Sequence, residues 1–215
     1  MFDLILTPLH FTAGRALSEL PGFQATAAPR RADRHRTTDL LAVYLSGSGG
    51  ESAESAFALL SEVYFRTGGT VTSAIKEAVE ALNENLLART ERAAVAMVMN
   101  LCVIRGSLVY IAHAGPTHTY VLSNGGVSEF FDPSSGGRGL GISRAVPLRF
   151  FQATVADGDA LLFCAEPPAD WPAALTTSQW KSPGAADLRA GLLRAQTGSG
   201  QVRVEPLPVA ARSVT

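Results

Sequence analysis

The sequence has few cysteines and few charges, and it has no long apolar run. Only 2 of its 215 residues are cysteines, which is too few for a disulfide framework in a chain of this length. No apolar stretch approaches the roughly 20 residues that a membrane-spanning helix requires. The opening Met-Phe-Asp-Leu-Ile-Leu carries an acid where a signal peptide carries positive charge, and Pro8 follows it. We therefore expect a cytoplasmic protein, with Cys102 and Cys164 as buried free thiols.

The low charge also restricts the partners. Charged residues make up 17% of the chain and the net charge is -1, so the whole molecule offers no electrostatic attraction to nucleic acid or to an anionic membrane. The one charge cluster is basic, Ala-Ala-Pro-Arg-Arg-Ala-Asp-Arg-His-Arg at residues 27–36. Such a run could contact phosphate, nucleic acid or an acidic partner, but a solvated loop between strands is the commoner structure. We therefore expect neither nucleic acid nor a membrane as a partner.

The apolar residues, in contrast, are abundant and regularly spaced. They recur at helical spacing over residues 51–66 and 70–89, on either side of Gly68-Gly69, which predicts an amphipathic helical hairpin. A further short helix is expected near residues 185–195. Strand patterns are expected at residues 40–45, 94–104, 108–114, 117–122, 127–131, 148–155, 160–164 and around 202–204. This order favours an α+β fold of layered sheets with outer helices.

Three segments resemble motifs of a two-metal phosphatase family, in the same order and at similar spacing. Ser-Gly-Ser-Gly-Gly at residues 46–50 follows a strand where the type 2C, or PPM, protein phosphatase family carries Asp-Gly-x-Gly-Gly. Ala-His-Ala-Gly-Pro-Thr-His-Thr-Tyr at residues 112–120 is similar to the family's Ala-x-x-Gly-Asp-Ser-Arg-x-Tyr hairpin. Gly-Asp-Ala-Leu-Leu-Phe-Cys-Ala-Glu-Pro at residues 158–167 resembles Gly-Asp-x-Leu-Leu-x-Cys-Ser-Asp-Gly. The alternative is an unrelated α+β domain whose turns use glycine and serine.

The resemblance implies an overall architecture. It predicts a four-layer αββα sandwich, in which two antiparallel β-sheets are flanked by helix pairs, as a single domain over residues 1–215. Residues 1–36 would form a divergent N-terminal strand and the basic loop, and residues 205–215 a disordered or linker tail. The Gly-rich segment 132–147 corresponds to the variable flap beside the family's catalytic cleft.

The resemblance also implies a degenerate metal site. In the family, Asp side chains and one Gly carbonyl hold two Mn²⁺ or Mg²⁺ ions that activate water against a phosphoserine or phosphothreonine. Here the first Asp position is Ser46, although Gly47 keeps its carbonyl, and the Asp of the third motif is Glu166. Near the N-terminus Glu19 is a candidate acid and Arg15 a candidate phosphate contact. Two adjacent dications need several carboxylates, so we expect no cofactor, and Mn²⁺ or Mg²⁺ only if the site partly works.

Three functions follow from these observations. The resemblance favours a pseudophosphatase that binds a protein partner or phosphoprotein, in a binding, scaffolding or regulatory role. The alternative is an active metal-dependent phosphatase or other hydrolase with a rebuilt site, in which His113 and His118, with Asp159 or Glu166, are the candidate ligands because imidazole suits transition metals. The commoner arrangement would be a half-buried, hydrogen-bonded His113 and a surface His118. A structural subunit of a larger assembly is the third hypothesis, suggested by 20 Gly, 12 Pro and the Pro-Leu-Pro of the tail.

Overall fold

The computed structural model contains two compact units. The first, here called the helical unit, comprises Pro21–Thr117 and Asp132–Ala153. The second, the six-strand unit, comprises Met1–Leu20, His118–Phe131 and Thr154–Thr215. The expectation of one domain over residues 1–215 stays a prediction. The residues that the structure describes are 10–12, 15–17, 22–47, 52–89, 97–124, 126–135, 139–146, 148–165, 167, 175 and 202–207.

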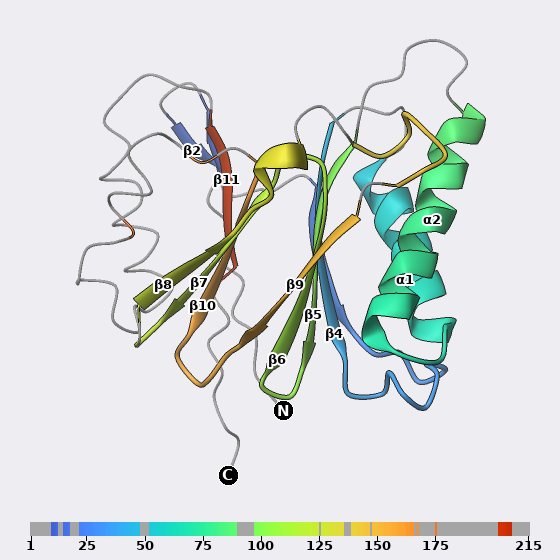
Figure 1. The fold of residues 1–215 in the computed structure, drawn as a ribbon, viewed down its shortest axis with the longest axis horizontal. Coiled ribbons are helices and arrows are strands. Elements are labelled where there is room, and N and C mark those ends of the chain that lie inside the picture. Colours follow the sequence, from blue (N-terminus) through green and yellow to red (C-terminus); the bar gives the residue numbers. More distant parts are fainter. Residues whose placement is uncertain are drawn as a thin grey trace. The chain divides into compact units, whose positions relative to one another are not determined.

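The helical unit is built on a five-stranded sheet in the order β3-β4-β5-β6-β9 (Figure 1). Neighbouring strands from β3 to β6 pair antiparallel. Strands β4 and β5 are buried along nearly their whole length, as is typical of strands covered on both faces. The bounds are Phe23–Ala27 for β3, Leu40–Ser46 for β4, Val98–Arg105 for β5, Leu108–Ala114 for β6 and Leu148–Thr154 for β9.

Two helices form a hairpin that covers one face of this sheet (Figure 1). Helix α1 spans Ala53–Arg66 and is capped by Ser52, whose hydroxyl accepts a 3.1 Å hydrogen bond from the amide of Ser55. Helix α2 spans Val71–Arg89. Between them Gly69 lies at φ 79°, in the left-handed region that glycine adopts without strain. The hairpin and its Gly-Gly break are thus as the sequence predicts.

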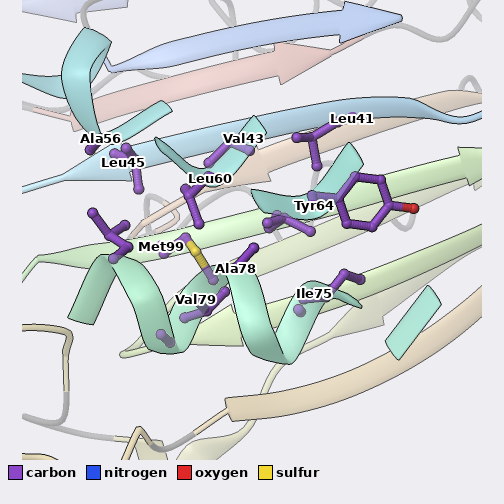
Figure 2. Close-up of a cluster of buried hydrophobic side chains, with 14 of the residues drawn as sticks. Leu41, Val43, Leu45, Ala56, Leu60, Tyr64, Ile75, Ala78, Val79 and Met99 are labelled. Atoms are coloured by element: carbon purple, nitrogen blue, oxygen red, sulfur yellow. The ribbon is translucent and has the colours of Figure 1, made fainter. Parts of the chain in front are cut away.

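The main hydrophobic core lies between the helix pair and the sheet (Figure 2). Because side chains alternate across a strand, β4 and β5 contribute every second residue to it. Burying one side chain of leucine size contributes about 1.5–3 kcal/mol, so this interface is the chief source of stability in the unit. The strand members are Leu41, Val43, Leu45, Met99, Leu101 and Val103, and the helix members include Ala56, Leu60, Tyr64, Ile75, Ala78 and Val79.

The loop between β3 and β4 contains a buried arginine, Arg36. Its guanidinium donates hydrogen bonds to backbone carbonyls after helix α1, to Thr67 at 3.2 Å and to Thr70 at 2.6 Å. It also lies 5.2 Å from the centre of the Tyr64 ring. A buried cation needs such partners, and the backbone carbonyls of the turn between the two helices provide them. The expectation of a solvated loop is therefore wrong for the last arginine of the basic run.

Asp39 anchors the same loop. Its buried carboxylate accepts two hydrogen bonds from the guanidinium of Arg105, at 2.6 and 2.7 Å. It accepts a third, at 2.6 Å, from the hydroxyl of Tyr64. Burial, followed by this hydrogen bond, raises the pKa of Tyr64. The carboxylate of Asp39 is thus committed to holding the loop, α1 and β5 together.

The six-strand unit contains a sheet in the order β2-β1-β11-β10-β7-β8. Strand β11 pairs antiparallel with β1 on one side and with β10 on the other. It runs through Leu207, so the first residues of the segment expected to be a tail belong to the sheet. The bounds are His10–Thr12 for β1, Arg15–Leu17 for β2, His118–Ser123 for β7, Gly126–Phe130 for β8, Ala160–Cys164 for β10 and Val202–Leu207 for β11.

Most expected elements are present within one or two residues of their predicted bounds. The main difference is the strand expected at 94–104, which begins at Val98 in the structure. Met97 before it pairs instead with Leu140 in an isolated bridge, and residues 94–96 lie outside the described part. So do the helix expected near 185–195 and the tail beyond Leu207. Among the described residues no helix is both long and apolar enough to cross a membrane.

Candidate functional site

The candidate site in the helical unit begins at the end of strand β4. Ser46 is the last residue of this strand and pairs with Val98 of β5. Gly47 follows at φ 111°, a conformation that favours glycine. The backbone thus turns sharply at the place where the family motif carries Asp-Gly. The side chain offered there is a neutral hydroxyl, and residues 48–50 lie outside the described part.

A row of buried polar residues crosses the sheet beside Ser46. Tyr44 of β4 pairs with Asn100 of β5, and Asn100 pairs with His113 of β6. Residues that pair directly across strands share a face, and Tyr44 shares that face with Ser46 because they lie two residues apart. Met99, next to Asn100, belongs to the core under the helices, so the polar row lies on the opposite face of the sheet.

Sequence reasoning missed two members of this row. The strand expected at 94–104 contains Asn100, which is fully buried. A buried side-chain amide inside a central strand needs hydrogen-bond partners. An asparagine within an apolar strand pattern was therefore the available sequence signal for this row. Tyr44 gave none, because a tyrosine is ordinary in a strand. His113 was expected to be half-buried, but it is 1% exposed and its ring lies 5.2 Å from that of Phe151.

His118, at the start of β7 in the six-strand unit, belongs to a different cluster. Its Nδ1 lies 2.7 Å from a carboxylate oxygen of Glu129, which also accepts a 2.9 Å hydrogen bond from the hydroxyl of Tyr120. The imidazole stacks on Phe131 with ring centres 3.9 Å apart. Its side chain is only 14% exposed, so the expected surface histidine is largely covered. Burial, and then the hydrogen bond to Glu129, raise the pKa of Tyr120.

Asp159 serves the turn before β10. Its carboxylate accepts a 2.8 Å hydrogen bond from the amide of Ala156, and its own amide donates to the Ala156 carbonyl. In the β7–β10 ladder, Ala160 pairs with Leu122 while Cys164 pairs with His118. Asp159 therefore lies five residues before the level of His118, roughly 17 Å along the strand. The structure does not bring these two candidate ligands together.

The described residues do not fit a pair of adjacent dications. Two such ions require several carboxylates in their coordination shells, whereas Ser46 and Gly47 offer a hydroxyl and a carbonyl. Among the residues that the structure describes, no three His, Cys, Asp or Glu residues form a metal-binding group. Glu19 and Glu166 lie outside these residues. Arg15 begins β2 and its backbone pairs with Thr12, but its side chain is not described.

The chain is similar in structure to bacterial serine/threonine phosphatases. Stp1 from Staphylococcus aureus is 13% identical, with a TM-score of 0.66 over 99% of this chain and 96% of that one. PppA, described as a key regulatory component of the T6SS in Pseudomonas aeruginosa, is 14% identical, with a TM-score of 0.58 over 99% and 96%. The catalytic domain of PstP, solved with two manganese ions, is 13% identical, with a TM-score of 0.56 over 99% and 98%.

These similarities establish the fold and not the activity, because the sequence identities are low. No protein-family model and no curated protein matches the chain. The structural neighbours are PPM-type phosphatases that this chain matches over nearly its whole length. The resemblance seen in the three sequence motifs is confirmed at the level of the fold. The chain has the α+β fold of the PPM-type serine/threonine phosphatases, whose architecture is the αββα sandwich.

Proposed function

We propose that this protein is a catalytically impaired PPM-fold module that acts by binding a protein partner in a scaffolding or regulatory role. The observation that carries the proposal is Ser46. It occupies the end of β4, next to the turn at Gly47, where the family motif has its metal-binding Asp. A neutral hydroxyl does not compensate the repulsion between two dications, so the water-activating metal pair loses a principal ligand.

Two further observations support this function. Asp39 lies at the opposite end of β4 from Ser46 and is held by Arg105 and Tyr64, so this acid does not replace the missing ligand. PppA, which has this fold, is described as a regulatory component, so regulation is compatible with the architecture. We also propose a cytoplasmic location, since both cysteines that the chain contains are free and buried.

The proposal is tested by titrating metal-free protein with Mn²⁺ in a calorimeter and then assaying p-nitrophenyl phosphate and a phosphoserine peptide in the same buffer. A metal-dependent phosphatase with the complete family motifs serves as the positive control. We expect no binding of an ion pair and no turnover, even at high protein concentration. Two bound ions with turnover would overturn the proposal. Bound metal that is lost on Glu166→Ala or His113→Ala replacement would instead indicate the rebuilt metal site.

A further inference from the structure

The loop between β3 and β4 carries three arginines that are exposed, Arg30, Arg31 and Arg34. Within the described part of the chain, none of their guanidinium groups pairs with a carboxylate. In contrast, the exposed Arg66 of helix α1 forms an ion pair with Glu62. We call these three residues the arginine triplet. Their positive charge is a local excess on a chain whose net charge is -1.

The nearest acid along the chain, Asp33, offsets only part of this charge. The carboxylate of Asp33 accepts hydrogen bonds from the amide of His35, at 2.9 Å, and lies 2.8 Å from its Nδ1. These contacts lower the pKa of Asp33, the backbone hydrogen bond most strongly. Asp33 therefore stays ionised and bonds within its own turn, and its single negative charge leaves the arginine triplet with a positive excess.

The loop that presents the arginine triplet is held in place. The amide of Ala32 bonds to the Pro29 carbonyl at 3.0 Å, and the amide of Asp33 bonds to the carbonyl of Phe65, in helix α1, at 2.7 Å. Arg36 and Asp39 fix its far end through the contacts described above. A loop ordered before binding loses less conformational entropy when a partner docks.

A groove lies beside this loop, where α1 ends and α2 begins. It has a volume of about 570 Å³ and includes Leu59 and Val63, two partly buried apolar side chains. Gly68 also lines it, and a Cβ at Gly68 would lie 3.5 Å from the carboxylate of Asp33. The groove and the loop are thus continuous. The groove is lined by Leu59, Glu62, Val63, Arg66, Thr67, Gly68 and Glu77.

We propose that the arginine triplet and this groove form a docking surface for an acidic segment of a partner protein. Carboxylates of the segment pair with the arginine triplet, and a neighbouring apolar side chain packs on Leu59 and Val63. Glu77 determines the orientation of the bound segment. Its negative charge in the groove disfavours carboxylates there and keeps them on the loop. Arginine suits this role, since its guanidinium binds a carboxylate through two parallel hydrogen bonds.

This inference deepens the proposed function by naming the class of partner, and it rests on the binding role and not on the loss of turnover. The test is a titration of the full ¹⁵N-labelled chain with a synthetic peptide of two leucines followed by a run of glutamates. Amide shifts are expected to change at residues 30–36 and 59–68. The affinity is expected to fall as salt is raised, because exposed charges are screened. The metal and phosphatase assays above are unaffected by either outcome.

Single replacements identify the contacts. Arg30→Ala, Arg31→Ala and Arg34→Ala are each expected to weaken peptide binding about 2- to 5-fold, and the triple variant roughly tenfold or more. Leu59→Ser is expected to weaken binding while leaving its salt dependence unchanged. The matched control is Arg144→Ala. Arg144 is exposed on a segment bound to Asn83, roughly 20 Å along α2 from its start, and its replacement should leave binding unchanged.

Three results would overturn the inference. The first is an absence of shifts at the arginine triplet and the groove. The second is an equal loss of affinity in Arg144→Ala, which would mean attraction without a defined surface. The third is tighter binding at the same residues by a single-stranded oligonucleotide than by the acidic peptide, which would assign the surface to nucleic acid. Unchanged thermal unfolding of each variant shows that a lost affinity is not a lost fold.

Discussion

Tyr64 donates a 2.6 Å hydrogen bond from its hydroxyl to the carboxylate of Asp39, and so ties helix α1 to the residue before strand β4. Both side chains are buried. The same carboxylate faces the guanidinium groups of Arg36, at 4.0 Å, and Arg105, at 2.6 Å. The carboxylate of Asp39 therefore contacts two guanidinium groups and one tyrosine hydroxyl, at the point where helix α1, the β3–β4 loop and strand β5 meet.

Replacing Asp39 is expected to destabilise the fold markedly. Asp39→Asn keeps the shape of the side chain but leaves both guanidinium groups without their anion, and breaking such a buried pair costs roughly 3 kcal/mol. Urea denaturation measures the change in the free energy of unfolding. Glu84→Gln, at an exposed carboxylate on helix α2, is the matched control and should change it by less than about 0.5 kcal/mol. Equal stability of the two variants would contradict the structural role of Asp39.

Two glycines with positive φ should respond differently to alanine. Gly22 lies at φ 93°, and a Cβ there would lie 2.2 Å from the backbone oxygen of Leu45. Gly106 lies at φ 57°, and a Cβ there would meet nothing within 4 Å. We expect Gly106→Ala to cost about 1 kcal/mol through backbone strain alone, and Gly22→Ala to cost clearly more because the strand must move. Thermal unfolding would refute this if Gly106→Ala were the less stable variant.

The two cysteines should be chemically inert in the folded protein. Burial raises the pKa of the Cys102 thiol well above its ordinary value, and Cys164 is buried as well. Because the thiolate is the reactive form, a disulfide reagent such as DTNB should titrate no thiol in native buffer and both thiols in denaturant. Rapid reaction of one thiol without denaturant would mean that its strand opens locally.

The carboxylate of Asp132 should make stability depend on pH in the acid range. Hydrogen bonds from Ser134 and the ion pair with Arg149 lower the pKa of Asp132 to about 2. Its folded-state pKa is thus below the ordinary value, near 3.9. The ionised group therefore stabilises the fold above about pH 4, and this contribution is lost as the pH falls towards about 2.

The pH dependence is measured by comparing wild type with Asp132→Asn in denaturation curves at several pH values. The stability difference between them should be constant above about pH 5 and should shrink as the pH falls through the range from about 4 to about 2. Arg149→Ala keeps the hydrogen bonds from Ser134 and should retain part of the effect. A difference that does not change with pH would contradict the depressed pKa.

The helical hairpin and most strands could be predicted from the sequence because their signals are local. Apolar spacing and the Gly-Gly break define the helices, and the turn at Gly106 defines the hairpin of β5 and β6. Arg36 could not be placed in this way. Its burial depends on the carbonyls of Thr67 and Thr70, more than thirty residues away, and local charge predicts only an exposed loop.

The candidate site was predictable in part for the same reason. Ser46 and Gly47 were identified because a motif places them at a strand end, and the structure puts that end there. The alternative ligands His118 and Asp159 belong to two consecutive motifs. In the structure they lie at different levels of the β7–β10 ladder. Asn100 shares a face with His113 only through strand register, which spacing along the chain does not reveal.

The position of strand β11 also constrains the order in which the protein can be assembled during synthesis. Strand β11 lies between β1 and β10, so the sheet of the six-strand unit stays in two pieces until residues 202–207 have been made. The helical unit has all of its strands once Thr154 has been added. On the ribosome the sheet of the helical unit is therefore complete first. Until residues 202–207 are made, the two parts of the other sheet have unpaired strand edges. In this period the nascent chain is most open to mispairing and to chaperones.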